Sequence, residues 1–426
     1  MTRRSFIKGV AAAGAASMLP VDAAVGGMLQ GCTEQPKNAM KWDFDEIIDR
    51  RGTWSIKCDR AGEGRLAMWV ADMDFRTDPA VSAALRERLD RDVLGYTDTP
   101  EEFYEAVRGW EARQHGWDVP REWVGYAPGV IASITQGYLT FTQPGDKVIV
   151  QPPVYDPFRR YAEQLGREVV DNPLILEGTH YRMDFEGLER LFDDRTKVLV
   201  LCNPHNPGGI LWSRETLQVL AEICERHGVV VFSDEIHADL ALSRPHIPFC
   251  SVSDAAARIG LMFCSPTKSF NIPGINGTAF CVIPDPAKRE IYLRNLDYAK
   301  QSEPSIPTIV ATIAAYNSRS GWLPALKDYL RGNIDCVMDF FADNDLGITA
   351  IRPEASFLVW LDCRSLGLPQ EELLKRFRDD AGVFLSDGAV YGKGGEGFVR
   401  LNIGCPRSIV KDALERIRAA FQARMR

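Results

Sequence analysis

Four short runs of apolar and β-branched residues, separated by segments with helical periodicity, constrain the fold of this chain more than any other feature. Polar or turn residues follow each run at once, and the runs are Lys147–Val150, Val198–Leu201, Val229–Phe232 and Leu261–Cys264. Such runs alternating with helices are typical of a mostly parallel sheet. The pattern predicts an α/β fold, whose ligands bind beyond the carboxyl ends of the strands.

The pattern changes after about residue 300, where helical segments accompany two further apolar runs. These runs are Phe357–Leu361 and Phe398–Asn402, and an amphipathic segment with Ile409, Leu414 and Ile417 on one face closes the chain. We therefore expect a smaller α+β domain after the large one.

Two proline-containing segments predict helix starts before the first strand. Asp78 precedes Pro79 and a helical pattern, which indicates an N-cap followed by proline in the first turn. Thr99 precedes Pro100 and has an acidic residue, Glu102, three positions later, which is the spacing of a capping box. We expect helices to begin at both places.

The first 32 residues have a different composition from the rest of the chain. Arg3 and Arg4 precede an uncharged Ala/Gly-rich run of 13 residues, 9–21, which is shorter than the roughly 20 residues that a membrane span needs. The segment resembles a twin-arginine export signal. Leu29–Cys32 resembles a lipobox with an untypical Gln30, so that Cys32 would carry the lipid.

This leader predicts an exported protein, periplasmic or lipid-anchored, and a cytoplasmic one if the leader is not used. No other segment is long and apolar enough to suggest a membrane span. A formal net charge of -8 gives no reason to expect nucleic-acid binding. The ten cysteines are spread singly, without the spacing of a zinc site, so we expect no metal.

Three of the strand ends carry polar motifs that point to one site. In chain order they are Asn203-Pro204-His205-Asn206-Pro207-Gly208-Gly209, Ser233-Asp234-Glu235-Ile236-His237 and Ser265-Pro266-Thr267-Lys268. Asn206 and Asp234 are 28 residues apart, and Asp234 and Lys268 are 34 apart. With this order and spacing, the chain after about residue 40 resembles the fold-type I enzymes of the class I/II aminotransferase family, which use pyridoxal 5'-phosphate (PLP).

The resemblance implies a role for each of four residues. Lys268 would hold PLP as a Schiff base and later take the α-proton of the substrate. Asp234 would keep the pyridine nitrogen protonated, and Asn206 would donate a hydrogen bond to the phenolic oxygen of the ring. Arg400 would bind the substrate carboxylate. The structural alternatives are a surface lysine, a helix cap at Asp234, a turn residue at Asn206 and a surface ion pair at Arg400.

Other positions match further cofactor contacts of the family. Ser265 and the backbone N–H groups of Val130 and Ile131, at a helix start, would bind the phosphate. Tyr155 would stack on the ring, with a core aromatic as the alternative. His237 stands where the wider family usually has a tyrosine, and it could instead be a structural histidine. Tyr96 matches the tyrosine that reaches the phosphate of the neighbouring subunit, which implies a homodimer with shared sites.

The resemblance also implies domain boundaries. We expect an N-terminal arm over residues 33–78 that joins the small domain, a PLP-binding large domain over 79–301 and a small domain over 302–426.

The sequences of four short segments favour one branch of the family, the cystathionine β-lyases and C–S lyases. The segments that carry this likeness are Met68–Phe75, Asp234–Leu240, Lys268–Gly274 and Arg400–Arg407. The implied reaction is β-elimination from an S-substituted cysteine to a thiol, pyruvate and ammonia. An aminotransferase on the same scaffold is the alternative. A regulatory protein that retains PLP is a third hypothesis, which export disfavours.

Two motifs point to other classes of enzyme. Ser265-x-x-Lys268 matches the SxxK of penicillin-interacting enzymes, but the chain contains neither SDN nor KTG. Gly392-x-Gly394-x-x-Gly397 matches a dinucleotide-binding fingerprint, but no helical pattern follows it. We interpret this glycine-rich stretch as a loop near Arg400.

Overall fold

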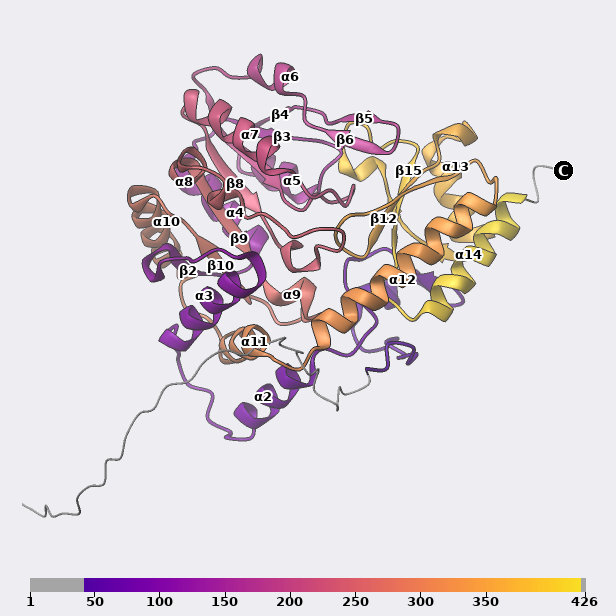
Figure 1. The fold of residues 1–426 in the computed structure, drawn as a ribbon, viewed down its shortest axis with the longest axis horizontal. Coiled ribbons are helices and arrows are strands. Elements are labelled where there is room, and N and C mark those ends of the chain that lie inside the picture. Colours follow the sequence, from indigo (N-terminus) through magenta and orange to yellow (C-terminus); the bar gives the residue numbers. More distant parts are fainter. Residues whose placement is uncertain (1–41, 423–426) are drawn as a thin grey trace, which may run out of the picture. The chain divides into compact units, whose positions relative to one another are not determined.

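A seven-stranded sheet runs through residues 42–422, the part of the chain that the computed structural model describes (Figure 1). The export signal and Cys32 lie outside these residues. From one edge to the other the strands are β2 (Val124–Ala127), β10 (Ala279–Val282), β9 (Gly260–Cys264), β8 (Val230–Asp234), β7 (Thr196–Cys202), β3 (Lys147–Val150) and β4 (Glu168–Asp171).

The five strands from β9 to β4 are parallel, and β10 pairs antiparallel with both of its neighbours. In the register of the sheet, Cys202 at the end of β7 lies opposite Asp234 at the end of β8, which in turn lies opposite Phe263 in β9. The carboxyl ends of three neighbouring strands therefore meet at one edge. This mostly parallel α/β sheet confirms the predicted fold class.

Alternate residues of each strand pack into two separate cores, one on each face of the sheet. Val148 and Val150 belong to one core and Ile149 to the other. Helices α4 (Val130–Phe141), α5 (Pro157–Gln164) and α10 (Pro286–Tyr298) contribute to the first core. The second contains residues of α2 (Pro79–Leu89), α3 (Glu101–His115), α6 (Phe185–Glu189), α7 (Arg214–Arg226), α8 (Asp254–Ile259) and α11 (Ile306–Asn317). Burial on both faces explains why the strands read as continuous apolar runs.

Gly137 leaves no room for a side chain between helix α4 and strand β8. A Cβ atom on Gly137 would come within 2.7 Å of the ring of Phe232 in β8. Any larger residue there would push the helix outward. The amino end of α4, at Gly129 and Val130, lines the same cavity as the ends of β7 and β8.

The C-terminal part of the chain forms a second, antiparallel sheet. Its order is β11 (Thr349–Ile351), β12 (Leu358–Asp362), β15 (Phe398–Asn402) and β14 (Ser386–Asp387). The long helices α12 (Trp322–Asp343) and α14 (Arg407–Gln422) accompany it (Figure 1). Shorter elements complete the fold: α1 (Ile56–Ala61), β1 (Leu66–Ala67), β5 (Ile175–Glu177), β6 (His180–Arg182), α9 (Pro266–Ser269), α13 (Gln370–Lys375) and β13 (Val383–Phe384).

Most local predictions agree with these elements. Strands β3 and β15 have the predicted bounds, and α2 begins at Pro79 with Asp78 capping the N–H of Ala80. The capping box at Thr99 is wrong: Pro100 occupies the N-cap position of α3, without a side-chain cap. The domain boundaries stay predictions. No helix of the described residues is long and apolar enough to cross a membrane.

Candidate active site

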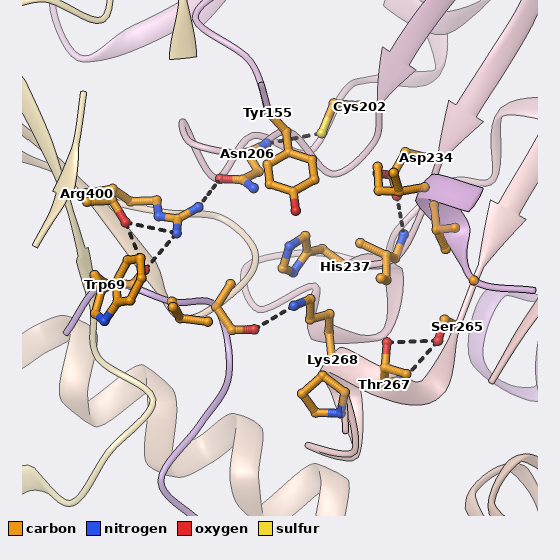
Figure 2. Close-up of a pocket in the computed structure, with 18 of the residues that line it drawn as sticks. Trp69, Tyr155, Cys202, Asn206, Asp234, His237, Ser265, Thr267, Lys268 and Arg400 are labelled. Atoms are coloured by element: carbon orange, nitrogen blue, oxygen red, sulfur yellow. Dashed lines mark hydrogen bonds between the residues drawn. The ribbon is translucent and has the colours of Figure 1, made fainter. Parts of the chain in front are cut away.

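A cavity of about 860 Å³ opens at the carboxyl ends of β7, β8 and β9, between these strand ends and the antiparallel sheet. Nine of the ten predicted site residues line it, as follows: Val130, Ile131, Tyr155, Asn206, Asp234, His237, Ser265, Lys268 and Arg400. Figure 2 shows most of them around one common space. Residues that are up to 270 positions apart in the chain therefore meet in one place.

Lys268 reaches the cavity from α9, the single helical turn that follows β9. Its Nζ donates a hydrogen bond to the carbonyl oxygen of Ala71 at 2.6 Å. Burial lowers the pKa of this amine to about 8, with the positive charge of Arg400 acting in the same direction and the carboxylates of Asp72 and Asp234 opposing it. At neutral pH a useful fraction of the amine is uncharged, as a nucleophile and base requires.

Ser265 and Lys268 share no hydrogen bond, although their spacing matches SxxK. The hydroxyl of Ser265 donates to the carbonyl of Thr278 and accepts the N–H of Thr267, so it caps the turn that carries Lys268. The geometry therefore does not support a serine nucleophile activated by this lysine. Its predicted contact with a phosphate stays a prediction.

Asp234 is a buried carboxyl group at the end of β8. Burial raises its pKa to about 7, although the N–H of Ile236, which donates to Oδ1 at 3.0 Å, opposes the rise. A cationic group of a ligand inside the cavity would lower the pKa of Asp234 again and so restore its charged form. The cap-like bond to Ile236 and a role toward a ligand are thus compatible.

Arg400 enters the cavity from β15 in the antiparallel sheet. Its Nη1 donates to Oδ1 of Asn206 at 2.9 Å, and its Nη2 donates to the carbonyl of Trp69 at 2.8 Å (Figure 2). The side chain also lies over the ring of Tyr391, with Cζ 5.3 Å from the ring centre. Its Nε is buried without a hydrogen-bond partner among the described residues. An anionic group of a ligand would satisfy this donor.

Asn206 links Arg400 to the strand ends. Its backbone N–H donates to the sulfur of Cys202 at 3.3 Å, while its side-chain oxygen accepts from Arg400. These bonds fix the amide so that its NH₂ group is the part left to donate to a ligand. A surface ion pair at Arg400 is wrong, because this side chain is buried.

The start of α4 provides a second kind of binding surface. Gly129 precedes the helix with φ 115° and has no side-chain cap, so the first backbone N–H groups of the helix, at Val130 and Ile131, point out of its end. Few residues other than glycine adopt this backbone conformation. The positive pole of a helix with exposed N–H groups favours a phosphate.

Tyr155 and His237 present their rings to the space between Asn206, Asp234 and Lys268 (Figure 2). Burial raises the pKa of Tyr155 to about 12. Burial also lowers the pKa of His237 to about 3, helped by the charges of Lys268 and Arg400, so this imidazole is neutral. Both rings are thus uncharged at neutral pH, which suits contact with a flat aromatic ligand.

Tyr96 is the predicted site residue that the structure does not bring to the cavity. Its side chain is fully exposed, in a surface depression beside Leu89, Leu94 and Pro304. Since the prediction places Tyr96 at the site of a neighbouring subunit, its distance from the cavity of its own chain does not contradict that role.

The residues that hold the reactive side chains were not predicted from the sequence. Ala71 accepts from Lys268, Trp69 and Ser386 accept from Arg400, and Tyr391 lies under it. Trp69 and Ala71 belong to the segment 68–75, which was noted only for its likeness to the C–S lyase branch. For Ser386 and Tyr391 the sequence offers no local signal. The glycines 392–397 form a loop that leads into β15, as predicted, and open no helix.

The fold and site define the class of this protein. Residues 68–417 match the family described as aminotransferase class I and II, and the chain belongs to this family. Among curated relatives it is 42% identical over 386 residues to cystathionine beta-lyase PatB of Bacillus subtilis (strain 168), which covers 89% of this chain and all of that protein. Protein MalY of Escherichia coli (strain K12) is 34% identical, covering 90% of this chain and 99% of MalY.

A solved structure shows the same likeness. Cystalysin from Treponema denticola superposes with a TM-score of 0.87 at 32% identity, covering 90% of this chain and all of cystalysin, and it contains a pyridoxal 5'-phosphate cofactor. The cavity described above fits this group. The helix start at Gly129 suits its phosphate, the raised pKa of Asp234 suits a protonated ring nitrogen, and Lys268 offers an amine. The described residues contain no cluster suited to a metal ion.

Proposed function

We propose that this protein is a PLP-dependent carbon–sulfur β-lyase that cleaves cystathionine or other S-substituted L-cysteines to a thiol, pyruvate and ammonia. The observation that carries the proposal is the cavity with Lys268, Asp234 and Arg400 in a chain 42% identical to a cystathionine β-lyase along all of that protein. Lys268 holds PLP, which when bound withdraws the electron pair left at the substrate's α-carbon.

The chain's own residues then have separate tasks. Arg400, whose guanidinium lines the cavity, binds the α-carboxylate, and this orients the α-hydrogen. Asp234 holds a proton at the ring nitrogen of the cofactor. The Lys268 amine takes the α-proton, for which its lowered pKa suits it.

Loss of the β-substituent completes the reaction. The bond between Cβ and sulfur breaks, sulfur leaves with the electron pair and becomes a thiol by taking a proton, and one water converts the remaining three-carbon enamine to pyruvate and ammonia. A buried site limits premature entry of water during proton transfer.

The decisive experiment measures pyruvate and thiol released from L-cystathionine by the PLP-loaded protein. We expect equal amounts of both products without any added 2-oxo acid. A strict requirement for a 2-oxo acid acceptor would instead establish the alternative, an aminotransferase, which the description of the matched family also covers. S-methyl-L-cysteine serves as a second substrate that lacks the distal amino-acid group of cystathionine.

We further propose a homodimer with shared active sites, in which Tyr96 serves the neighbouring subunit. The proposal is supported by a group of exposed apolar side chains around it, at Leu89, Val93 and Leu94. Mixing Tyr96→Ala with Lys268→Ala protein tests it: mixed dimers would contain one site without either change and recover up to about half the activity per site. Two inactive parents that stay inactive after exchange would contradict shared sites.

Export through the N-terminal leader is a separate proposal, supported by Arg3, Arg4 and the apolar run that follows. Replacing both arginines with lysine should retain the protein in the cytoplasm of a bacterial host, as measured by cell fractionation. Incorporation of labelled palmitate that is lost in Cys32→Ser would establish lipidation. Unchanged fractionation of the lysine variant would contradict twin-arginine export.

A further inference from the structure

A network of buried titratable side chains lies behind the cavity and takes no part in the proposed reaction. It contains Glu111 and His115 from α3, and Glu235, Asp239 and His246 from the segment after β8. The buried hydroxyl of Ser269, at the end of α9, joins it. Burying so many ionisable groups is costly unless they pair with one another. Their arrangement therefore needs an explanation.

Asp239 is the member of this network that contacts both α3 and α9. Its Oδ1 accepts hydrogen bonds from Nε1 of Trp110 at 2.8 Å and interacts with Nε2 of His115 at 3.1 Å. Its Oδ2 accepts from the hydroxyl of Ser269 at 2.8 Å. Trp110 and Ser269 thus bind the same carboxylate from opposite oxygens, one on the side of α3 and one on the side of the cofactor lysine.

Glu235 also has partners on both of its carboxylate oxygens. Its Oε1 accepts from the hydroxyl of Ser233 and the N–H of Phe249, each at 2.8 Å, and its Oε2 lies 2.6 Å from Nε2 of His246. Asp234 is followed directly by Glu235, and Lys268 is followed directly by Ser269. Each of these two cofactor residues is therefore adjacent in the chain to a member of the network.

The charges within the network balance locally. Burial lowers the pKa of His115, but the carboxyl groups of Glu111 and Asp239 outweigh it and raise this pKa to about 9. Burial raises the pKa of Asp239, but the hydrogen bonds from His115, Trp110 and Ser269 leave it below its ordinary value. His115 and Asp239 consequently form an ion pair at neutral pH, within which Asp239 is a strong acceptor.

Further titratable groups surround the pair of His115 and Asp239. Burial raises the pKa of Glu111 to about 8, opposed by the charge of His115, and burial lowers the pKa of His246. Burial raises the pKa values of Cys264 and Tyr316 well above their ordinary range and lowers that of Lys327 on α12. Glu235 acts electrostatically on Glu111, His115 and His246.

We propose that Asp239 and Ser269 are positioning residues: the Asp239 carboxylate, paired with His115, holds the turn of α9 through Ser269 and thereby fixes the Lys268 amine relative to the cofactor. The inference rests on the proposed role of Lys268. The single turn α9 is held at its start by Ser265, which bonds Thr278 and Thr267, and Ser269 holds its end through Asp239. A small misplacement of a reacting group is sufficient to slow catalysis.

Two variants that each remove one hydrogen bond from Asp239 test the proposal. Ser269→Ala removes the bond on the lysine side, and Trp110→Phe removes the bond on the far side while retaining an aromatic ring. For PLP-loaded Ser269→Ala we expect kcat to fall about tenfold with KM changed less than about twofold. We also expect the PLP dissociation constant to rise about tenfold and the pH midpoint of the cofactor's visible absorption to shift by about half a unit.

For Trp110→Phe we expect the opposite balance of effects. Its melting temperature should fall at least as far as that of Ser269→Ala, because the smaller ring also leaves a cavity, while its kcat and absorption midpoint stay close to those of the parent. Equal effects of both variants on kcat and absorption, or no effect of Ser269→Ala, would overturn the positioning role.

The cofactor readouts also separate this proposal from the proposed lyase reaction. PLP dissociation and the absorption midpoint are measured without substrate, so they remain valid whatever reaction the protein catalyses. If Lys268→Ala retained the visible absorption of the parent, the cofactor role of Lys268 itself would be wrong. A normal lysine-bound absorption that Ser269→Ala leaves unchanged would refute only the role of the network.

Discussion

The two ends of the cofactor cavity present different kinds of group: backbone N–H donors at one end and reactive side chains at the other. At the start of α4, the donors are backbone N–H groups of consecutive residues in one strand-to-helix turn, prepared by the unusual φ of Gly129. At the other end, the reactive groups are the side chains of Asp234, Lys268 and Arg400, which come from three separate strands and turns. The first end depends on local conformation and the second on the assembly of the whole fold.

This difference separates binding from chemistry. Backbone donors at a helix start hold a phosphate whatever side chains surround them, but they supply no proton acceptor. At the other end Asp234 and Lys268 have shifted pKa values, which suit proton transfer. Lys268 and Arg400 depend on partners distant in the chain, Ala71 and Asn206. We therefore expect substitutions at the helix start to weaken cofactor binding and substitutions of the reactive side chains to slow catalysis.

The largest effect should follow Lys268→Ala. Without the amine, no group covers both the covalent attachment of PLP and the removal of the α-proton, so kcat/KM should fall by about 10³-fold or more. The visible absorption of lysine-bound PLP should also disappear. Steady-state kinetics and an absorption spectrum measure the two effects.

The comparison also predicts what Lys268→Ala retains. Since the helix start at Gly129 is unchanged, the variant should still bind PLP noncovalently, as equilibrium dialysis can determine, and it should stay folded by circular dichroism. Activity within about tenfold of the parent would contradict the role of the lysine.

Arg400→Gln should have the next largest effect. The change removes a buried charge that we expect to bind the substrate carboxylate, so kcat/KM should fall about 10²-fold, mainly through KM. Ser386→Ala provides a matched control, because it removes one acceptor of Arg400 at 3.2 Å and leaves the guanidinium in place. Its effect should be about threefold or less. Equal losses in both variants would show that the orientation of Arg400, rather than its charge, is limiting.

The sequence predicted the strand ends of this site well because the relevant physics is local. Apolar runs identify buried strands, and parallel strands bring Asn206, Asp234 and Lys268 to one edge whatever connects them. The capping box at Thr99 failed because Pro100 occupies the N-cap position, so that a helix start was predicted correctly for the wrong reason.

The rest of the site depends on contacts that sequence spacing does not encode. Arg400 was identified through family resemblance alone, and Tyr391 and Ser386, which orient it, carry no local signal. The pair of His115 and Asp239 joins residues 124 positions apart, through the packing of α3 against the segment after β8. Such contacts follow from how elements pack, which the pattern of any one segment does not determine.

Gly129→Ala should have a smaller effect that falls on binding. A Cβ atom at this position would meet nothing within 4 Å, so the change acts only by straining a backbone with φ +115°. Strain of this kind costs about 1–3 kcal/mol. We expect PLP affinity to fall about tenfold, with kcat of the saturated enzyme within about twofold of the parent.

Gly228→Ala is the control for this prediction. Gly228 also has a positive φ, +65°, and open space for a Cβ atom, but it follows α7 away from the cavity. It should lower the melting temperature without changing PLP affinity. A large loss of kcat in saturated Gly129→Ala would contradict the division between binding and chemistry.

The smallest effect concerns pH, and it distinguishes the two ends because only one of them titrates. In PLP-free protein the pKa of Lys268 is lowered from 10.5 to about 8, chiefly by burial. Between pH 8 and 10.5 the unfolded chain therefore binds a proton that the folded chain does not, so the free energy of unfolding should rise with pH across this window.

Lys268 is only partly buried. Solvent screening should therefore limit the rise in the free energy of unfolding to about 1–2 kcal/mol. Urea unfolding of PLP-free parent and Lys268→Met at several pH values isolates the contribution of this lysine, because all other titrating groups are common to both. The difference between the two proteins should change steadily from pH 8 to 10.5 and be constant below it. A difference that does not vary with pH would mean that the amine reaches solvent in the free protein, and its readiness as a base would then depend on bound PLP.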